Sequence, residues 1–386
     1  MPLEEKNPQV KAKTVMIVAG EASGDMHGAA LVREMLKINP SLNFYGIGGN
    51  RLGEIGVKLV ANAAEMAVVG LTEVFFKLGK FIKIMNRMKK SMDSRKPDLV
   101  ILIDYPDFNL PLARAARKRG IKVFYYISPQ VWAWRKGRIE QIKKTVNKMA
   151  VILPFEVDTY KERGFAVEYV GHPLLDLVKP HYSQSESRKK FNLSADKTTV
   201  GLLPGSRPSE TQKLLPEMLQ AAEILAQKIP DIQFILPLAD TLEEKMISET
   251  IAGAGIKITV VSGNTYDVIS CADLAIVASG TATLETALLG IPMIIIYKIS
   301  PFSYFVGKLA VSVKNIGLVN IIAGKTIVPE LIQDKADAGH IAREALAILE
   351  NSARRREIIS ELAKIRAKLG KPGAAIRAAK LACDML

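Results

Sequence analysis

The sequence predicts an α/β protein with two doubly wound, Rossmann-like domains that face a cleft, followed by C-terminal helices. Apolar strands, glycine-containing turns and amphipathic helices follow one another along the chain, in two successive series. Strands that are apolar throughout are typical of parallel sheets covered by helices on both faces. The length of 386 residues also fits roughly two or three domains of ordinary size.

The first series predicts an N-terminal domain over residues 1–178. Each of its first two strands precedes a predicted helix, and the second of these helices ends at Gly120. The strands of this series are expected at residues 14–20, 97–106, 122–128, 149–154 and 166–171.

A polar stretch, residues 179–197, is expected to be an interdomain linker with a short helix, and the second series follows it. This series predicts a C-terminal Rossmann-like domain over residues 179–365, with ligands at the carboxyl ends of its strands. Residues 366–386 are expected to form a helix that returns to the first domain or exchanges with a partner chain. The strands are predicted at 198–206, 232–239, 256–263, 272–279 and 291–298.

The composition excludes several classes of protein. Hydrophobic residues make up 48% and charged residues 24% of the chain, so it is neither disordered nor collagen-like. The two cysteines, Cys271 and Cys383, cannot form a disulfide framework, which favours a reducing compartment. No apolar run reaches the roughly 18 residues that a membrane span needs, and the N-terminus lacks a signal-peptide core. We expect a cytoplasmic protein that is soluble or peripheral to a membrane.

The net charge of +14 is concentrated in the N-terminal half of the chain. Residues 77–96 carry a net charge of +7, and residues 114–148 carry +10. The remainder is therefore slightly acidic. This pattern predicts a basic face that meets an anionic partner, for which nucleic acid, phosphosugars and anionic lipid all qualify.

Two strand-to-helix junctions in the second series are candidate ligand sites. In residues 202–210, Gly205 and Ser206 form a turn before a helix, and Arg207 offers a planar donor for phosphate. The alternative is an ordinary turn with a surface arginine. In residues 278–292, Gly280 and Thr281 open a helix, and Glu285 could accept hydrogen bonds from a ribose 2′,3′ diol. Its alternative is a glutamate that stabilises a helix N-terminus.

Two junctions in the first series carry acidic residues. Residues 20–29 lack the GxGxxG pattern, so a dinucleotide cofactor is not expected, but Glu21, Ser23 and Asp25 could contact sugar hydroxyls. Asp25 could instead cap a helix. Asp104 ends the most apolar strand of the chain, where a partly desolvated carboxylate can act as a general base. It could equally be an ordinary aspartate at the start of a loop.

Residues 68–92 combine an apolar helical stripe with an almost purely cationic polar face. Such a helix suits a membrane interface, although a helix packed in the core is the alternative. Ile84 is expected to widen the apolar surface. The residues predicted to contact the membrane are Val69, Leu71, Phe75, Phe76, Leu78, Phe81 and Ile82. Nothing in the spacing of the four histidines suggests a metal site.

The ordered motifs of the chain resemble the lipid-A-disaccharide synthase family of GT-B glycosyltransferases. The matching blocks span about 300 residues. They include GEASGDMHGA (20–29), GIGG (46–49), MAVVGLTEV (66–74), DYPDFN (104–109), YISPQVWAWRKGR (126–138), LPFE (153–156), YVGHPLLD (169–176), LLPGSR (202–207), SGTATLETALLGIPMIIIYK (279–298) and GLVNIIAG (317–324).

The resemblance implies a reaction of lipid A and lipopolysaccharide biosynthesis in Gram-negative bacteria. A 2,3-diacylglucosamine would pass, with inversion, from UDP-2,3-diacylglucosamine to the 6-hydroxyl of 2,3-diacylglucosamine 1-phosphate. UDP and a β(1→6) disaccharide 1-phosphate would be the products. It also implies no metal or cofactor, peripheral attachment to the anionic inner face of the inner membrane, and a homodimer that exchanges C-terminal segments.

The resemblance also assigns roles to individual residues. Asp104 would be the base and Glu21 an acidic residue near the reacting sugars. In the donor site, Arg207 would contact the diphosphate, Glu285 the ribose and Asn320 the donor. Many relatives have a small residue at the position of Tyr105, which is expected to reshape the acceptor side.

Two other functions remain open at the level of the sequence. The first is another GT-B enzyme, such as a UDP-sugar 2-epimerase or a glycosyltransferase with a soluble acceptor. The apolar cationic helix argues against it, because a soluble acceptor needs no membrane contact. The second is a basic nucleic-acid-binding protein, for which no known binding module is present.

Overall fold

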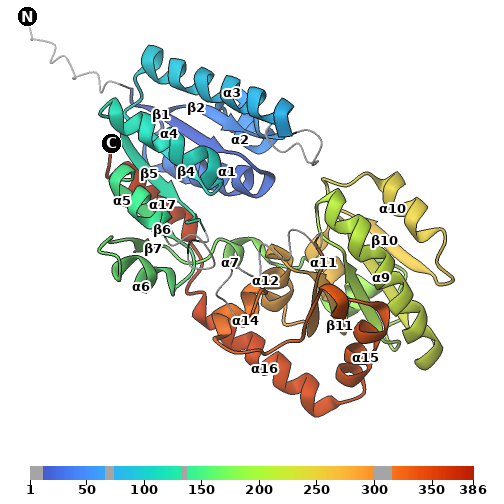
Figure 1. The fold of residues 1–386 in the computed structure, drawn as a ribbon. Coiled ribbons are helices and arrows are strands. Elements are labelled where there is room, and N and C mark those ends of the chain that lie inside the picture. The colour runs from blue at the N-terminus through green and yellow to red at the C-terminus, as the bar shows by residue number, and fades with distance from the viewer. Residues whose placement is uncertain (1–11, 66–73, 130, 132–136, 300–314) are drawn as a thin grey trace, which may run out of the picture. The chain divides into compact units, whose positions relative to one another are not determined.

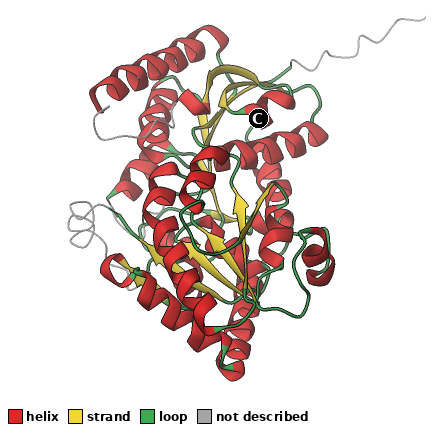
Figure 2. Ribbon diagram, turned by 90° about the vertical axis from the view of Figure 1, so that its right-hand side faces the viewer, coloured by secondary structure: helices red, strands yellow, loops and turns green. Residues whose placement is uncertain are grey.

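The computed structural model describes residues 12–65, 74–129, 131, 137–299 and 315–386, with residues 74–78 described by their backbone alone. The chain forms two compact units (Figure 1). The first unit comprises residues 1–173 together with 372–386, and the second comprises residues 174–371. Each unit is a parallel sheet flanked by helices (Figure 2), so the predicted α/β class is confirmed.

The sheet of the first unit has the strand order β3-β2-β1-β4-β5-β6-β7, and every described pair is parallel. Its central strands are apolar on both faces and fully buried, as the sequence LVILI of β4 illustrates. The strands are β1 (Thr14–Ala19), β2 (Asn43–Gly48), β3 (Lys58–Asn62), β4 (Leu99–Ile103), β5 (Lys122–Tyr126), β6 (Lys148–Val151) and β7 (Glu168–Tyr169).

Helices bury both faces of this sheet. Side chains of α3 and α4, among them Met88 and Phe108, form the core on one face. Side chains of α1 and the C-terminal α17, among them Leu31 and Ala378, form the core on the other. The helices are α1 (Ala22–Ile38), α2 (Asn50–Glu54), the 3-10 helix η1 (Ala63–Glu65), α3 (Val74–Arg95), α4 (Pro106–Lys118), α5 (Arg138–Thr145), α6 (Glu156–Lys161) and α17 (Ala374–Cys383).

The C-terminal helix α17 is part of the first unit although it follows the whole second unit in the chain. It packs along α1. Arg377 Nε donates to the carbonyl oxygen of Val170 at 2.8 Å, and Lys122 Nζ donates to that of Met385 at 2.6 Å. The last residues of the chain thus close one face of a sheet built from its first half.

The second unit repeats the architecture with the strand order β10-β9-β8-β11-β12-β13. Its strands are β8 (Thr199–Leu203), β9 (Gln233–Leu238), β10 (Ile258–Ser262), β11 (Leu274–Ala278), β12 (Met293–Tyr297) and β13 (Glu330–Ile332). Its helices are α7 (Leu174–Leu177), α8 (Gln184–Lys190), α9 (Pro208–Lys228), α10 (Glu244–Ile251), α11 (Thr265–Ser270), α12 (Thr281–Leu288), α14 (Leu318–Ala323), the 3-10 helix η3 (Gln333–Lys335), α15 (Ala338–Leu349) and α16 (Ser352–Lys368).

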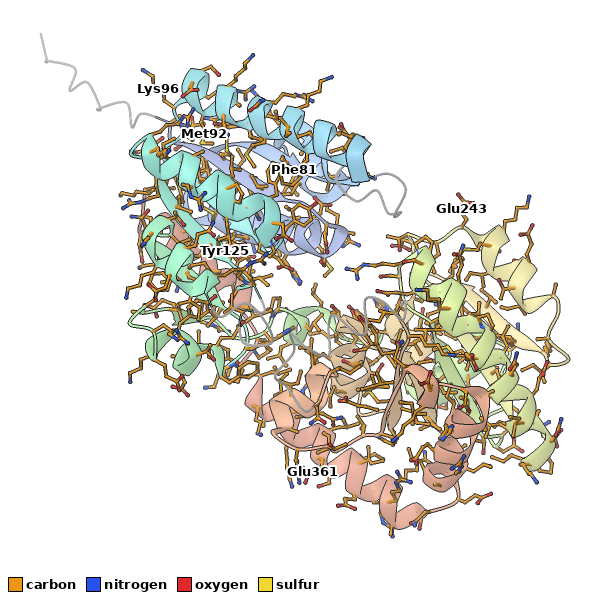
Figure 3. All side chains as sticks on the ribbon, viewed as in Figure 1. Phe81, Met92, Lys96, Tyr125, Glu243 and Glu361 are labelled. Carbon is orange, nitrogen blue, oxygen red and sulfur yellow. The ribbon has the colours of Figure 1, made fainter. Side chains whose placement is uncertain are left out.

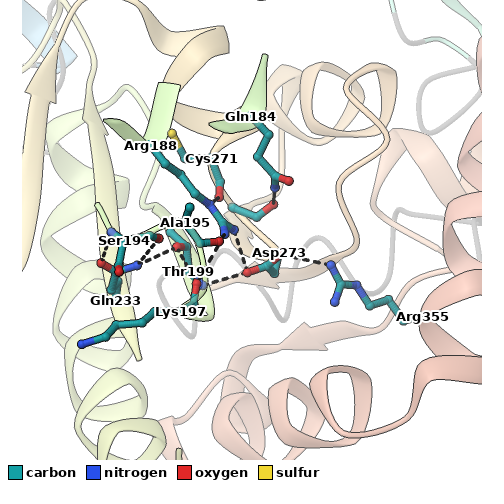
Figure 4. A network of polar contacts seen from close by, with 11 residues as sticks. Gln184, Arg188, Ser194, Ala195, Lys197, Thr199, Gln233, Cys271, Asp273 and Arg355 are labelled. Atoms are coloured by element: carbon teal, nitrogen blue, oxygen red, sulfur yellow. Dashed lines mark hydrogen bonds and ion pairs between the residues drawn. The ribbon is translucent and has the colours of Figure 1, made fainter. Parts of the chain in front are cut away.

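The polar stretch expected to be a linker is packed against the second unit. Its helix α8 begins at a capping box between Ser183 and Glu186. The buried Arg188 of α8 pairs with Asp273 at 2.8 Å, and the same carboxylate pairs with Arg355 of α16 at 3.1 Å (Figure 4). Arg188 Nε also donates to the carbonyl oxygen of Cys271 at 2.9 Å. These contacts fix residues 184–197 as part of the unit.

Candidate functional site

The first candidate site lies where the strand order of the first sheet reverses. The adjacent strands β1 and β4 are parallel, so their carboxyl ends meet at the same edge of the sheet. In doubly wound sheets, ligands bind at this switch point. Glu21 follows β1 and Asp104 follows β4, so the structure brings together the two acidic positions predicted from the sequence.

The backbone at the end of β4 is held in an unusual conformation. Asp104 and Tyr105 have φ values of 45° and 43°, in the left-handed region that residues with a Cβ rarely adopt. Tyr125 Oη donates to the Asp104 carbonyl oxygen at 2.5 Å, and Asn109 Nδ2 donates to the same oxygen at 2.7 Å. Asn109 is fully buried, and so is Tyr125, which is labelled in Figure 3. Strain held by its surroundings in this way is typical of functional sites.

Carboxylates and tyrosine hydroxyl groups lie close to one another at this switch point. Burial raises the pKa of Tyr125 well above its usual range, and the negative charge of Asp104 raises it further. Burial also raises the pKa of Tyr105, with further contributions from the charges of Glu21 and Asp107. Both phenols therefore remain protonated at neutral pH and can act as hydrogen-bond donors.

Asp25 has a structural role in this unit. Its Oδ1 accepts hydrogen bonds from the backbone N–H groups of Gly49 at 2.6 Å and Leu52 at 3.2 Å, and its Oδ2 accepts one from Arg51 at 3.1 Å. Asp25 thus satisfies N–H groups at the start of α2, and it is not the N-cap of its own helix α1, where Glu21 holds that position. Ser23 is exposed in the first turn of α1.

Two buried histidines lie near each other in the first unit. Burial lowers the pKa of His27 to about 4. Burial, with a further contribution from His27, lowers the pKa of His172 to about 3. Nδ1 of His27 has no hydrogen-bond partner among the described residues. Both side chains are therefore neutral at physiological pH, a feature that their separation in the sequence did not suggest.

The predicted membrane helix is α3, and its described part corrects the prediction at two residues. Phe81 packs edge to face against Phe108, with ring centroids 5.0 Å apart, and Ile84 is buried. Figure 3 shows Phe81 and Met92 on the side of α3 that faces the sheet. Ile82 is 49% exposed, as predicted. Val69 and Leu71 lie outside the described residues, as do the side chains of Phe75, Phe76 and Leu78.

The second candidate site lies at the switch point of the second sheet, between the parallel strands β8 and β11. After β8, Gly205 has a φ of 106°, which a residue with a Cβ rarely adopts. Thr241 Oγ1 donates to the carbonyl oxygen of Ser206 at 2.5 Å. Arg207 precedes α9, and its Nη1 lies 3.0 Å from Oε1 of Glu210. The Arg207 side chain is 59% exposed, so an anion can reach it.

The neighbouring strand β11 leads into α12 and carries Glu285. Gly280 and Thr281 are exposed at the start of α12, where backbone N–H groups lack intrahelical partners. Burial raises the pKa of Glu285, and a hydrogen bond from Tyr266 lowers it in part. Tyr266 Oη lies 3.2 Å from Oε1 of Glu285. Parallel pairing thus places the loop that carries Arg207 and the helix that carries Glu285 after the carboxyl ends of adjacent strands.

Asn320 has a structural role rather than the predicted direct contact with a donor. Its Nδ2 donates to the carbonyl oxygen of Val328 at 2.9 Å and to Glu330 Oε1 at 2.7 Å. Its Oδ1 accepts from the N–H groups of Ile327 at 2.8 Å and Val328 at 3.1 Å. This fully buried side chain uses both donors and both lone pairs inside the unit.

The part of the chain that the structure describes contains no group of three His, Cys, Asp or Glu residues placed to hold a metal ion. Within the same residues, every helix is too short or too polar to cross a membrane. Three residues near the switch points, Tyr125, Glu210 and Tyr266, are not marked as site residues by the sequence. Their partners are distant in the sequence or depend on the conformation of a loop, so no local motif identified them.

Comparison with known proteins finds a family model and curated relatives that match almost the whole chain. A family model described as Lipid-A-disaccharide synthetase matches residues 15–382. A lipid-A-disaccharide synthase of Syntrophus aciditrophicus (strain SB) is 57% identical over 380 residues, covering 98% of this chain and 99% of the relative. One of Geobacter sulfurreducens is 49% identical over 372 residues, covering 96% and 97%.

Solved structures with low sequence identity share the fold. The UDP-GlcNAc 2-epimerase from Neisseria meningitidis, solved with UDP-GlcNAc, has a TM-score of 0.61 at 12% identity and covers 96% of this chain and 98% of its own. A glycosyltransferase from Rickettsia africae has a TM-score of 0.59 at 13% identity, with coverages of 97% and 99%. These likenesses establish the GT-B architecture of two Rossmann-like domains.

Proposed function

The chain belongs to the lipid-A-disaccharide synthase family, and from this premise we propose how its two units divide the reaction. It is a glycosyltransferase that acts on lipid-linked sugars. The reaction transfers 2,3-diacylglucosamine from its UDP donor to the 6-hydroxyl of 2,3-diacylglucosamine 1-phosphate and releases UDP. Membership in this family, at 57% identity to one relative, favours neither of the other functions considered, epimerisation or nucleic-acid binding.

The second unit binds the UDP-sugar in this proposal. Arg207 and the exposed amides at the start of α12 provide positive charge for the departing diphosphate. Glu285 accepts hydrogen bonds from the ribose hydroxyls. This assignment is supported by the switch point between β8 and β11, which brings a phosphate-type loop and a carboxylate to one edge of the sheet.

The first unit supplies the general base. Transfer with inversion requires a group that takes the proton of the attacking 6-hydroxyl as the bond to the anomeric carbon forms. We assign this role to Asp104 and place Glu21 beside the reacting sugars. The observation that carries the assignment is the left-handed backbone of Asp104, fixed by hydrogen bonds from Tyr125 and Asn109.

Peripheral attachment to the inner face of the inner membrane, and a homodimer, complete the proposal. The exposed Ile82 lies among cationic residues of α3 that are also exposed. That composition suits contact with anionic lipid. The cationic residues are Lys80, Lys83, Arg87 and Lys90.

In the proposed dimer, two chains would exchange α17, and each α17 would keep the same contacts with α1 of the other chain. Light scattering would measure the mass of this dimer.

The decisive experiment is incubation of the purified chain with UDP-2,3-diacylglucosamine and 2,3-diacylglucosamine 1-phosphate. We expect equimolar UDP and a disaccharide 1-phosphate by mass spectrometry. A parallel incubation replaces the acylated acceptor with glucosamine 1-phosphate, and another offers UDP-GlcNAc alone. Disaccharide formed equally well from the soluble acceptor, or epimerised UDP-GlcNAc, would contradict the proposed function.

A further inference from the structure

We propose that Tyr266 is a positioning residue that fixes Glu285 for the ribose and makes the donor site selective for ribonucleotides over 2′-deoxyribonucleotides. This inference rests on the proposed donor site of the second unit and adds a residue to it. No sequence motif identified Tyr266, which lies 19 positions before Glu285 and on another helix. The hydrogen bond between the Tyr266 hydroxyl and Oε1 of Glu285, at 3.2 Å, motivates the proposal.

The short helix that carries Tyr266 is anchored firmly. In α11, Val268 and Ile269 are buried in the unit. The fully buried Asp267 accepts hydrogen bonds from the backbone N–H groups of His181 at 2.6 Å and Tyr182 at 3.2 Å. Because the residues that directly follow Tyr266 in the helix are fixed in this way, its hydroxyl is a donor with a defined position.

The charge of Glu285 explains why a defined donor matters. Burial disfavours the carboxylate form of Glu285, and the hydrogen bond from Tyr266 favours it. A carboxylate offers about four lone-pair sites, so one bond from a phenol leaves capacity for two ribose hydroxyls. The phenol also selects one rotation of the carboxylate, which directs its remaining lone pairs.

Selectivity follows from the cost of an unpaired acceptor. A site built to accept hydrogen bonds from a hydroxyl group rejects a ligand that lacks this hydroxyl, because its polar atoms then remain unpaired. The effect requires the acceptor to be held in place, since a mobile carboxylate can turn to another partner or to water. Removing the Tyr266 hydroxyl should therefore weaken the binding of UDP more than that of 2′-deoxy-UDP, which keeps only the 3′-hydroxyl as a donor to Glu285.

The test is calorimetric titration of the full chain with UDP and with 2′-deoxy-UDP. The parent chain should bind UDP at least about tenfold more tightly, because one hydrogen bond to a charged group is at stake. Tyr266→Phe should weaken UDP binding by about tenfold and 2′-deoxy-UDP binding by about threefold or less, because the latter loses the support of one ribose hydrogen bond instead of two. Glu285→Gln should also abolish the preference. Tyr182→Phe, which removes a phenol hydroxyl from an exposed side chain of the same unit, should change neither affinity.

The outcomes separate this inference from the proposed function. If Tyr266→Phe loses equal affinity for both nucleotides, or loses no affinity, the positioning role is overturned. The proposed function would still stand if the parent chain forms the disaccharide. If the parent chain forms the disaccharide but shows no preference for UDP, the ribose assignment of Glu285 fails together with this inference. Far-ultraviolet circular dichroism and thermal melting of each variant verify that it is folded.

Discussion

A Cβ atom added at Gly20 would lie 2.5 Å from Cδ1 and 2.7 Å from Cγ of the Tyr105 ring. The ring therefore covers the backbone of the turn that follows β1. Because Tyr105 directly follows Asp104, this contact joins the two strand ends of the first switch point. The tyrosine ring at position 105 thus fits only because position 20 has no side chain.

Gly20→Ala should destabilise the first unit by about 1–3 kcal/mol and lower turnover, because the methyl group must displace a ring next to Asp104. Thermal unfolding and turnover measure the two effects. Gly53→Ala is the matched control, since its nearest contact would be an ordinary 3.6 Å to Leu59. The double variant Gly20→Ala, Tyr105→Ala should recover stability, and failure to recover would contradict the ring contact.

Asp104→Asn should reduce turnover by about 10²–10⁴-fold, because an amide cannot accept the proton of the attacking hydroxyl. UDP binding should be unchanged, since the proposed nucleotide contacts belong to the second unit. Asp107→Asn is the control, because Asp107 lies on α4 and pairs with Arg138. Turnover of Asp104→Asn close to that of the control would remove the assignment of the base.

Arg207→Ala should raise the activation barrier by about 2–4 kcal/mol if the guanidinium stabilises the departing diphosphate. The quantity to measure is kcat/KM at saturating acceptor. Lys213→Ala removes an exposed cation from the same helix α9 and should have little effect. A loss below about tenfold for Arg207→Ala would favour the reading of Arg207 as an ordinary surface arginine.

Acid should destabilise the first unit through His27 and His172. Their pKa values in the folded chain, about 4 and about 3, lie below the ordinary 6.5, so the unfolded chain binds more protons as the pH falls below 6.5. Each histidine should lower the free energy of unfolding by about 2 kcal/mol between pH 7.5 and pH 5. His27→Leu should lose less stability than the parent between these two pH values, as measured by thermal melts at each pH. Equal losses in the variant and the parent would contradict the role of His27.

Ile82→Ser should weaken binding to vesicles of anionic lipid without lowering the melting temperature, because the side chain is largely exposed. Ile38→Ser is the control, since Ile38 is exposed to a similar extent on α1. Phe81→Ser should instead lower the melting temperature, because it removes the ring packed against Phe108. Equal vesicle binding by the two isoleucine variants would argue against a membrane contact at Ile82.

The sequence predicted the elements with strong apolar patterns and missed the weaker ones. Strand β4 and the following Asp104 stand out because five consecutive apolar residues are buried on both faces. The strands β2, β3 and β13 are not among those that the sequence predicts. The last of these has three residues, and β3 is largely exposed, so neither has a long apolar run.

The sequence predicts where a site residue lies in the fold better than it predicts which groups its side chain bonds to. Strand order determines where Glu21, Asp104, Arg207 and Glu285 lie, and the alternation of strands and helices predicted that order in outline. The hydrogen bonds of a polar side chain depend on residues far away in the sequence, as those of Asn320 show. The helical stripe of α3 likewise could not reveal which of its apolar residues another helix covers.

The position of α17 has a consequence for synthesis on the ribosome. The sheet of the first unit is translated early, yet Ala378, Ala379 and Ala382, which seal one of its faces, are made last. The side of α1 that packs against α17 therefore lacks its cover until translation ends, and exposed apolar surface of this kind is prone to aggregation. A chain that terminates before residue 372 would never cover it, so premature stop products should be recognised by chaperones and proteases.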